Sequence, residues 1–233
     1  MKCICLFLAM SLLLFSCGKK EIDSATQLKQ NQAVEEYLET GDLIFVGLPM
    51  SYSLDPAAVN PPANEETCAG DSLNVIHVAM VEVVGDSTWV IDATLKHNVA
   101  RYPLDTFLAD FTLLDGSMPL FIIKRLVDNR HAKEFVENAK QFIGQPYDIY
   151  FSSDKEAQFC SELVRNSYVA DGVPLFGEYP MNFQKVDGTF PIYWKQLFQL
   201  IHLKIPQDKM GTTPAQMMSE EILKIVDYQL IKK

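Results

Sequence analysis

The chain has 233 residues and a formal net charge of −10 at pH 7. A protein this acidic has no electrostatic attraction for the phosphates of nucleic acids or for an anionic bilayer, so we expect neither kind of binding. Hydrophobic residues make up 48% and charged residues 21% of the chain, which is usual for a globular domain of one core.

The first residues have the layout of a secretory signal peptide. Lys2 gives a positive start, an apolar run covers residues 3–14, and the small residue Ser16 precedes Cys17. The run is too short to span a bilayer comfortably. The ending Leu-Phe-Ser-Cys over residues 14–17 resembles a lipobox, in which Cys17 is acylated and becomes the first residue of the mature protein. The alternatives are an ordinary signal peptide or a short membrane anchor.

Export and lipidation define the expected domain organisation. Loss of the signal peptide, residues 1–16, removes only Lys2 and changes the net charge from −10 to −11. We expect anchoring to the membrane through the N-terminal lipid, with the protein on the periplasm-facing outer membrane of the cell envelope; buried acyl methylenes contribute about 0.8 kcal/mol each. Residues 17–39 are predicted to form a tether and a short helix, from about residue 25 to 37, before a single domain over residues 40–233.

The pattern of the domain predicts an α+β fold, with a mainly antiparallel sheet packed against helices. The predicted strands cover residues 41–46, 75–84, 87–93, 98–102 and 119–126. The predicted helices cover residues 103–108, 130–143 and 160–170, and a capping box at residues 213–216 opens another. Residues 222–230 fit either a strand or a helix. Residues 48–74 are a long irregular segment, which we expect to border a cleft, because such loops are usually functional or disordered.

Cys160 begins the second long predicted helix, directly after a polar loop. Unpaired backbone N–H groups at a helix N-terminus carry partial positive charge, which favours a thiolate and can hydrogen-bond an oxyanion. Cys160 is therefore a candidate nucleophile. The alternative is a small core residue, because Cys160 shares a helix face with Leu163 and Val164.

His77 is the candidate base, and it lies among apolar residues in the predicted strand 75–84. It is either a core histidine or one presented into a cleft, where a third group must orient its ring. Glu82 is at an odd offset from His77 and points to the opposite face of the sheet. If residues 85–86 form a two-residue turn, Asp92 lies opposite Ala79, one diagonal step from His77; an odd-length loop would reverse this. We expect Asp92 to be the orienting acid.

The cysteine count leaves two thiols. Cys3 and Cys5 leave with the signal peptide and Cys17 is acylated, so Cys68 and Cys160 remain in an oxidising compartment. They could form a disulfide, which would block the nucleophile, or Cys160 is catalytic and Cys68 is incidental. The count does not decide between these alternatives.

Four motifs in order carry a family resemblance. They are Gly-Asp-Leu-Ile-Phe at residues 41–45, the strand bearing His77 with Asp92 on the next strand, Gly-Gln-Pro-Tyr-Asp at 144–148, and Phe-Cys-Ser-Glu-Leu-Val at 159–164. Together they resemble the circularly permuted NlpC-type, papain-like cysteine hydrolases of the YiiX-like branch. In that group the histidine strand precedes the cysteine helix, as it does here. The resemblance spans roughly residues 40–215, including Gly-Thr-Thr-Pro at 211–214.

The resemblance implies a papain-like fold and a Cys–His–acid triad that falls on Cys160, His77 and Asp92. The family often has tyrosine immediately before the nucleophile, whereas this chain has Phe159, which lacks a hydroxyl. Support of the oxyanion then rests mainly on the Cys160 N–H, with Gln158 or Tyr147 as helpers. We expect Tyr147, Phe159 and Gln158 to contact the substrate or the oxyanion. Tyr147 is either a core aromatic or part of the cleft wall.

The expected function is hydrolysis of an amide bond, of the peptide or peptidoglycan type, in the cell envelope. The alternatives are an amidase or acyltransferase acting on lipids or N-acyl amino acids, and a non-catalytic envelope binding protein. The chain has no HExxH, CxxC or phosphate-loop pattern, so we expect no metal and no cofactor. The expected partner is a peptide-like or acyl-amide substrate, and the protein is expected to be a monomer.

Overall fold

A computed structural model describes residues 37–152 and 156–230 of the chain. The predicted signal peptide, Cys17 and residues 25–36 of the predicted N-terminal helix lie outside this range. None of the helices in the described ranges is long and apolar enough to cross a membrane.

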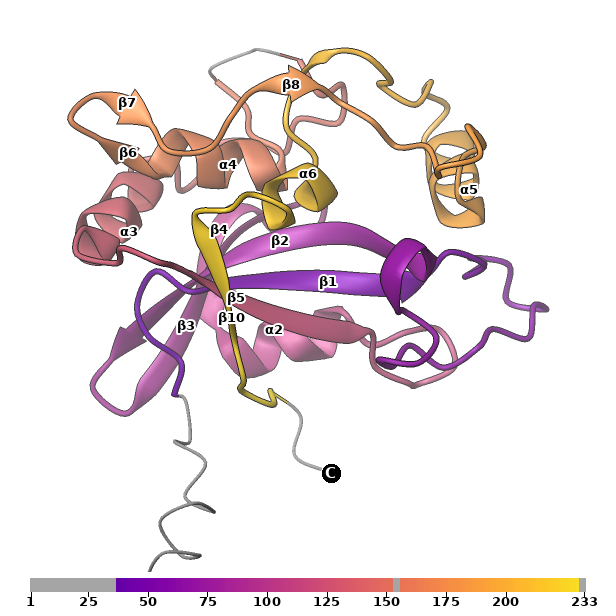
Figure 1. The fold of residues 1–233 in the computed structure, drawn as a ribbon, viewed down its shortest axis with the longest axis horizontal. Coiled ribbons are helices and arrows are strands. Elements are labelled where there is room, and N and C mark those ends of the chain that lie inside the picture. Colours follow the sequence, from indigo (N-terminus) through magenta and orange to yellow (C-terminus); the bar gives the residue numbers. More distant parts are fainter. Residues whose placement is uncertain (1–36, 153–155, 231–233) are drawn as a thin grey trace, which may run out of the picture. The chain divides into compact units, whose positions relative to one another are not determined.

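A six-stranded antiparallel sheet forms the centre of the fold, with the strand order β10-β5-β1-β2-β3-β4 (Figure 1). Its strands are β1 (Leu43–Pro49), β2 (Leu73–Val84), β3 (Ser87–Thr94), β4 (Asn98–Pro103), β5 (Leu120–Leu126) and β10 (Leu223–Val226). A 3-10 helix, Gly70–Ser72, precedes β2. Two short pairs lie outside this sheet, β6 (Val169–Ala170) with β7 (Val173–Pro174), and β8 (Tyr179–Pro180) with β9 (Met210–Gly211). The α+β class predicted from the sequence is confirmed.

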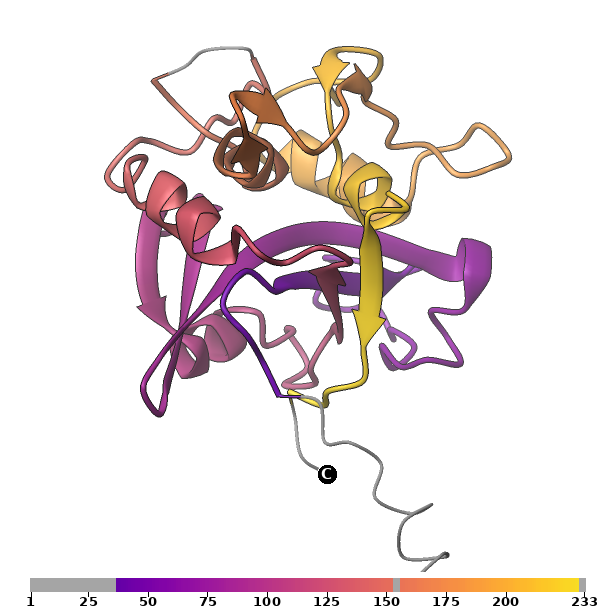
Figure 2. The same cartoon turned by 60° about the vertical axis from the view of Figure 1, so that its left-hand side comes forward.

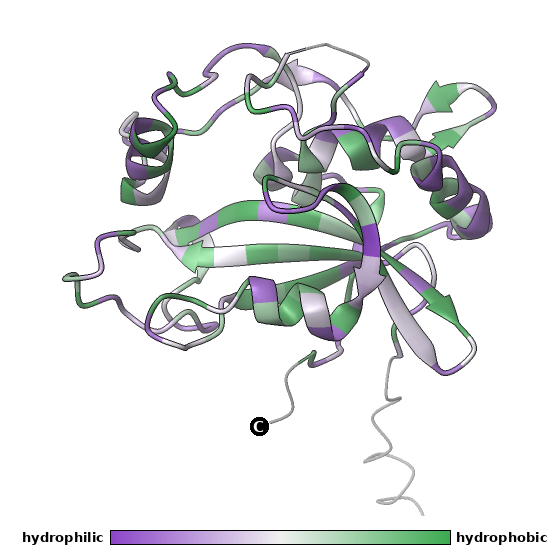
Figure 3. Ribbon diagram, turned by 180° about the vertical axis from the view of Figure 1, so that it is seen from behind, coloured by the Kyte–Doolittle hydropathy of each residue, from purple (hydrophilic) through white to green (hydrophobic). Residues whose placement is uncertain are grey.

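Helices cover both faces of the sheet (Figures 1 and 2). Helices α3 (Ala132–Lys140), α4 (Cys160–Ser167) and α6 (Pro214–Met218) pack on one face, and α2 (Leu104–Asp110) packs on the other. Helix α5 (Ile192–Leu200) belongs to a third, aromatic cluster. Because both faces of the central strands are covered, every residue of β1 is buried, and these strands are mostly hydrophobic along their length (Figure 3).

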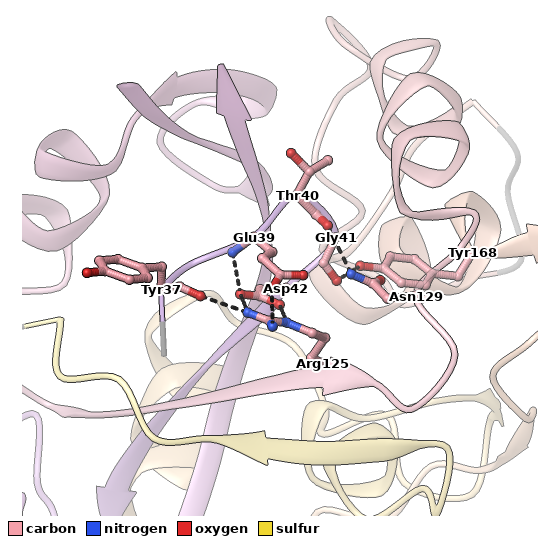
Figure 4. A network of polar contacts seen from close by, with 8 residues as sticks. All are labelled: Tyr37, Glu39, Thr40, Gly41, Asp42, Arg125, Asn129 and Tyr168. Carbon is pink, nitrogen blue, oxygen red and sulfur yellow. Dashed lines mark hydrogen bonds and ion pairs between the residues drawn. The ribbon is translucent and has the colours of Figure 1, made fainter. Parts of the chain in front are cut away.

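Gly41 and Asp42, directly before β1, contact both the helical layer and strand β5 (Figure 4). Gly41 has φ 86°, and a Cβ there would lie 2.7 Å from the Cβ of Ala132 in α3, so only glycine fits. The hydroxyl of Tyr168, which follows α4, donates to the Gly41 carbonyl at 2.7 Å. Asp42 is fully buried and accepts two hydrogen bonds from the guanidinium of Arg125 in β5, at 2.6 and 3.0 Å.

The predicted helix 130–143 is too long at both ends, because α3 covers only Ala132–Lys140. Beyond Lys140 the amides of Phe142 and Ile143 bond to carbonyls three residues earlier, at 3.1 and 3.3 Å. The last turn is therefore tighter than an α-helix before Gly144 ends it, as is common at helix termini.

The predicted helix 160–170 also ends early, at Ser167. Residues 169–170 instead pair with residues 173–174 across a two-residue turn in which Asp171 and Gly172 have φ of 52° and 78°. Positive φ at both central positions is typical of the tight turns that close hairpins. Helix α5 was not predicted, because it lies within a stretch of the chain that is rich in proline and aromatic residues.

Candidate active site

Cys160 is the first residue of α4, and its side chain is buried. The chain reaches it through a loop that is closed at its base. The amide of Asp148 donates to the Gln158 carbonyl at 3.0 Å, and the amide of Gln158 donates to the Pro146 carbonyl at 3.1 Å. The sulfur therefore lies beside the first-turn N–H groups of α4, where a developing negative charge is stabilised.

His77 lies beside an irregularity in β2. It pairs with Val46 of β1, whereas Val75 pairs with Gly47, so Ile76 is an extra residue on this strand. Such a bulge re-aims the side chains beside it and is frequent next to active sites. His77 is 7% exposed, and the centroid of its ring lies 4.9 Å from that of Phe111.

The β2–β3 hairpin brings Asp92 to His77. Val84 pairs with Ser87 across residues 85–86, which is the register that the pleat argument requires. The Oδ1 atom of Asp92 lies 2.7 Å from Nε2 of His77. Glu82, the other nearby acid, instead forms ion pairs with Arg101 of β4 at 2.5 Å and with Lys140 of α3 at 2.6 Å.

The His77 imidazole interacts with both Asp92 and Cys160. Burial lowers its pKa, but the charges of Asp92 and Cys160 and hydrogen bonds to both side chains outweigh burial and raise the pKa to about 10. Because Nε2 faces Asp92, the ring nitrogen left for the sulfur is Nδ1. The arrangement can hold a protonated imidazole beside the sulfur and take that proton to and from a reacting group.

A pocket of about 170 Å³ opens onto Cys160 and His77. Its other walls are mainly apolar and aromatic. They include Ile76 and Leu95 from the sheet side, Phe111, Ile149 and Phe151 from loops, Met181 and Phe183, and Trp194, Leu197, Phe198 and Ile201 from α5 and its end. Thr94, Ser161, Thr212 and Thr213 supply aliphatic hydroxyls to the lining. The pocket therefore suits a substrate with an apolar group next to the bond that reacts.

Two tyrosines of the pocket, Tyr147 and Tyr193, lie near the sulfur. Burial, followed by the charge of Cys160, raises the pKa of each hydroxyl, so both stay protonated at neutral pH. A neutral phenol can donate a hydrogen bond to a negatively charged oxygen. Of the three residues expected to contact substrate or the oxyanion, Tyr147 lines the pocket.

Comparison with known proteins identifies the family. The sequence pattern of the permuted papain-like amidase enzymes, YaeF/YiiX, of the C92 family matches residues 37–227. The chain belongs to this family. The fold is also similar to the crystal structure of the metalloprotein YiiX from Escherichia coli O157:H7, with a TM-score of 0.56 and 22% identity, over 82% of this chain and 97% of that chain. No curated protein matches.

Membership of the family makes the chain a papain-like cysteine hydrolase of the amidase type. The solved relative supports the fold alone, because it is only 22% identical. In residues 37–152 and 156–230 we find no group of three His, Cys, Asp or Glu side chains that could hold a metal ion.

The other two expected site residues are Phe159 and Gln158. Neither is among the described residues that line the pocket. The Phe159 ring packs into the aromatic cluster with Met181, Phe183, Trp194 and Phe198, and it is 3% exposed. The Gln158 side chain is fully buried and accepts a hydrogen bond from Asn166 at 2.9 Å. Both residues are therefore buried in the interior and do not reach the pocket.

The thiols of Cys68 and Cys160 are both free, so the alternative of a disulfide between them is wrong for this structure. Cys68 is buried within the irregular segment, beside Thr67. That segment does not border the pocket as expected, because none of residues 48–74 lines it. The segment instead supports α5: the amide of Leu54 donates to the Gln196 side chain at 2.6 Å.

The α5 residues of the pocket were missed by the sequence analysis. Trp194, Leu197, Phe198 and Ile201 follow the i, i+3, i+4, i+7 spacing of one helix face, which is the signal that could have found them. Trp194 is fixed to β2, because its indole N–H donates to Oδ1 of Asn74 at 2.9 Å. Tyr193, the other tyrosine near the sulfur, comes from the same helix.

Proposed function

We propose that this protein is a cell-envelope cysteine hydrolase that cleaves an amide bond through Cys160, His77 and Asp92. The observation that supports it best is the position of His77, which interacts with Asp92 on one side and with Cys160 on the other, at the wall of a pocket. A nucleophile, a base and a group that orients the base are the parts that covalent hydrolysis requires.

The proposed reaction has two halves. The proton of the Cys160 thiol moves to His77, the thiolate attacks the carbonyl carbon, and a C–S bond forms while the carbonyl oxygen becomes an oxyanion. The oxyanion collapses, the C–N bond breaks, and the leaving amine takes the proton from His77. Water then attacks the thioester, with His77 as its base, and releases the acid and the thiol.

First-turn N–H groups of α4, beginning with that of Cys160, are the proposed donors to the oxyanion. Tyr147 is the proposed side-chain helper, since it lines the same pocket and its hydroxyl stays protonated beside Cys160. Removal of one such donor typically costs about 10²–10³-fold in rate, so these groups carry much of the catalysis.

The proposed substrate is an amide of the peptide or peptidoglycan type. An acyl amide, such as an N-acyl amino acid or a lipid amide, is the second candidate, and the apolar lining of the pocket favours it. Transfer of the acyl group to an acceptor other than water would use the same thioester. Binding without catalysis is the third candidate, supported by the absence of a tyrosine at position 159.

The proposed location is the cell envelope, with the protein attached through a lipid on Cys17. The lipobox-like sequence Leu-Phe-Ser-Cys at residues 14–17 supports this location. Intact-mass measurement of the protein from membranes tests it. We expect the wild type to carry acyl chains on an N-terminal Cys17. A Cys17→Ser variant that still carries the acyl mass and still stays with the membranes would contradict this location.

The reactivity of Cys160 tests the proposed chemistry without a substrate. Alkylation by iodoacetamide near neutral pH, followed by mass spectrometry, should modify Cys160 much faster than a free thiol. His77→Ala should remove this excess, whereas His202→Ala, a change outside the pocket lining, should leave it unchanged. Equal rates in the wild type and in His77→Ala would count against an activated pair.

A substrate panel separates the three candidates. The protein with residues 1–16 removed is incubated with muropeptides and with N-acyl amino acids of increasing chain length, beside a Cys160→Ala control. Cleavage of muropeptides that is lost in the control supports the first candidate, and cleavage of acyl amides alone supports the second. No product from either panel, together with an unreactive Cys160, supports the third.

A further inference from the structure

The contact between His77 and Asp92 continues to a third strand of the sheet. Asp92 of β3 pairs with Ala100 of β4, and Tyr102 lies two residues further along β4. The Tyr102 hydroxyl donates to Oδ2 of Asp92 at 2.8 Å, while Oδ1 of the same carboxylate faces His77 at 2.7 Å. Three neighbouring strands therefore each contribute one side chain to a continuous chain of hydrogen bonds.

This chain of hydrogen bonds is buried at each step. Asp92 is 1% exposed, His77 7% and Tyr102 8%. Burial, followed by the charge of Asp92, raises the pKa of the Tyr102 hydroxyl, so the hydroxyl stays protonated at neutral pH and can donate. Asp92 thus has one oxygen held by the Tyr102 hydroxyl, while its other oxygen faces the imidazole.

We propose that Tyr102 is a positioning residue that sets the reactivity of Cys160 through Asp92 and His77. Without a donor on Oδ2, the Asp92 carboxylate has a second rotamer and a buried, unpaired oxygen, so Oδ1 is no longer held toward the His77 ring. The inference rests on the proposed function, since it gives the Cys160–His77–Asp92 group a fourth member.

Other polar groups lie around Tyr102. The ring of His97 lies 4.8 Å from the Tyr102 ring, and Nε2 of His97 lies 2.6 Å from Asp110, which also pairs with Lys96. Asp110 adds to the rise in the Tyr102 pKa. Neither His97 nor Asp110 lines the pocket, so the contact to Asp92 is the path through which Tyr102 acts.

A buried hydroxyl also contributes to stability, so the test needs a matched control. Tyr168→Phe supplies it. The Tyr168 hydroxyl is buried and donates at 2.7 Å to the Gly41 carbonyl, away from the pocket. Tyr102→Phe and Tyr168→Phe each keep the ring and remove one buried hydrogen bond, and only the first touches Asp92.

The experiment compares the wild type, Tyr102→Phe and Tyr168→Phe by two readouts. The first is the alkylation rate of Cys160 with iodoacetamide near neutral pH, and the second is the titration of the His77 ring by NMR, assigned with His77→Ala. In Tyr102→Phe we expect the alkylation excess to fall about tenfold and the midpoint of His77 to move toward its ordinary value, by about one pH unit. Tyr168→Phe should match the wild type in both readouts while losing similar stability.

The outcomes separate this inference from the proposed function. Tyr102→Phe could lose stability but keep the wild-type alkylation rate and the wild-type His77 midpoint. Tyr102 would then be a structural residue, which overturns the inference while the proposed function stands. If the wild type itself shows no alkylation excess, the proposed function fails. In that case the His77 titration still tests whether Tyr102 positions the ring. A His77 midpoint in Tyr102→Phe equal to that of the wild type overturns the inference.

Discussion

Nε2 of His77 lies 2.7 Å from Oδ1 of Asp92, and both side chains are buried. In the folded protein the pKa of His77 is raised from 6.5 to about 10, so the folded state holds a proton more tightly than the unfolded state. The stability from the interactions of the protonated ring with Asp92 and Cys160 is therefore fully present below about pH 6.5 and is lost as the pH rises through about 10.

The pH dependence of unfolding checks this sign. Urea unfolding of the wild type and of Asp92→Asn should differ most at pH 6, and the difference should shrink as the pH approaches 10. Asp208→Asn, a change at an exposed aspartate, is the control and should show no such trend. A difference that is constant between pH 6 and 10, or that grows, would contradict a His77 proton bound through Asp92.

The buried ion pair of Asp42 and Arg125 predicts a large loss of stability in Arg125→Met. Asp42 is fully buried, and removal of the guanidinium leaves its charge without compensation, which costs about 3–5 kcal/mol. Burial already raises the pKa of Asp42, so the variant should recover part of this loss at acidic pH, when the carboxyl takes up a proton.

Urea unfolding at pH 7 and pH 5 measures both effects. Arg130→Met is the matched control, since Arg130 pairs with Asp128 on the surface and its loss should not change stability measurably. The double variant Asp42→Asn/Arg125→Met should be more stable than Arg125→Met alone. If Arg125→Met lowers the free energy of unfolding as little as Arg130→Met does, the Asp42–Arg125 pair does not stabilise the packing of β1 against β5.

The fold was predictable where a local pattern decides the structure. The apolar runs on either side of the turn at residues 85–86 predict the β2–β3 hairpin and its register, and these place Asp92 on the same side as His77. The capping box is also local: Thr213 Oγ1 accepts from the Gln216 amide at 3.2 Å, as the sequence predicts. Such features depend on residues that are close together in the chain, so they can be predicted from the sequence.

Features that depend on distant partners were not predictable. The bulge at Ile76 is a property of how β2 pairs with β1, so no local pattern displays it. The pocket wall of α5 lies more than 30 positions after Cys160 in the chain and is fixed by Asn74 and by residues 53–54. Phe159 does not line the pocket because its ring packs within the aromatic cluster, whose members come from several segments.

The hydrogen bond between Trp194 and Asn74 predicts a cost for Trp194→Phe. Both side chains are buried, and loss of the indole N–H leaves Oδ1 of Asn74 without its donor, which costs about 1–3 kcal/mol. A double-mutant cycle with Asn74→Ala measures the pair, and the double variant should be less destabilised than the sum of the singles. Strict additivity would mean that the two residues do not stabilise each other.

Phe159→Tyr tests whether the residue before Cys160 can reach the oxyanion in this chain. The Phe159 ring lies 4.9 Å from that of Phe151 within the aromatic cluster and is 3% exposed. A hydroxyl added there has apolar neighbours, and burial of a polar group without a partner costs about 1–3 kcal/mol. We therefore expect lower stability and no increase in the alkylation or hydrolysis rate. Phe190→Tyr is the control, because Phe190 lies half-buried at the edge of the same cluster, where a new hydroxyl reaches solvent. A faster Phe159→Tyr enzyme at unchanged stability would mean that this ring turns toward the pocket.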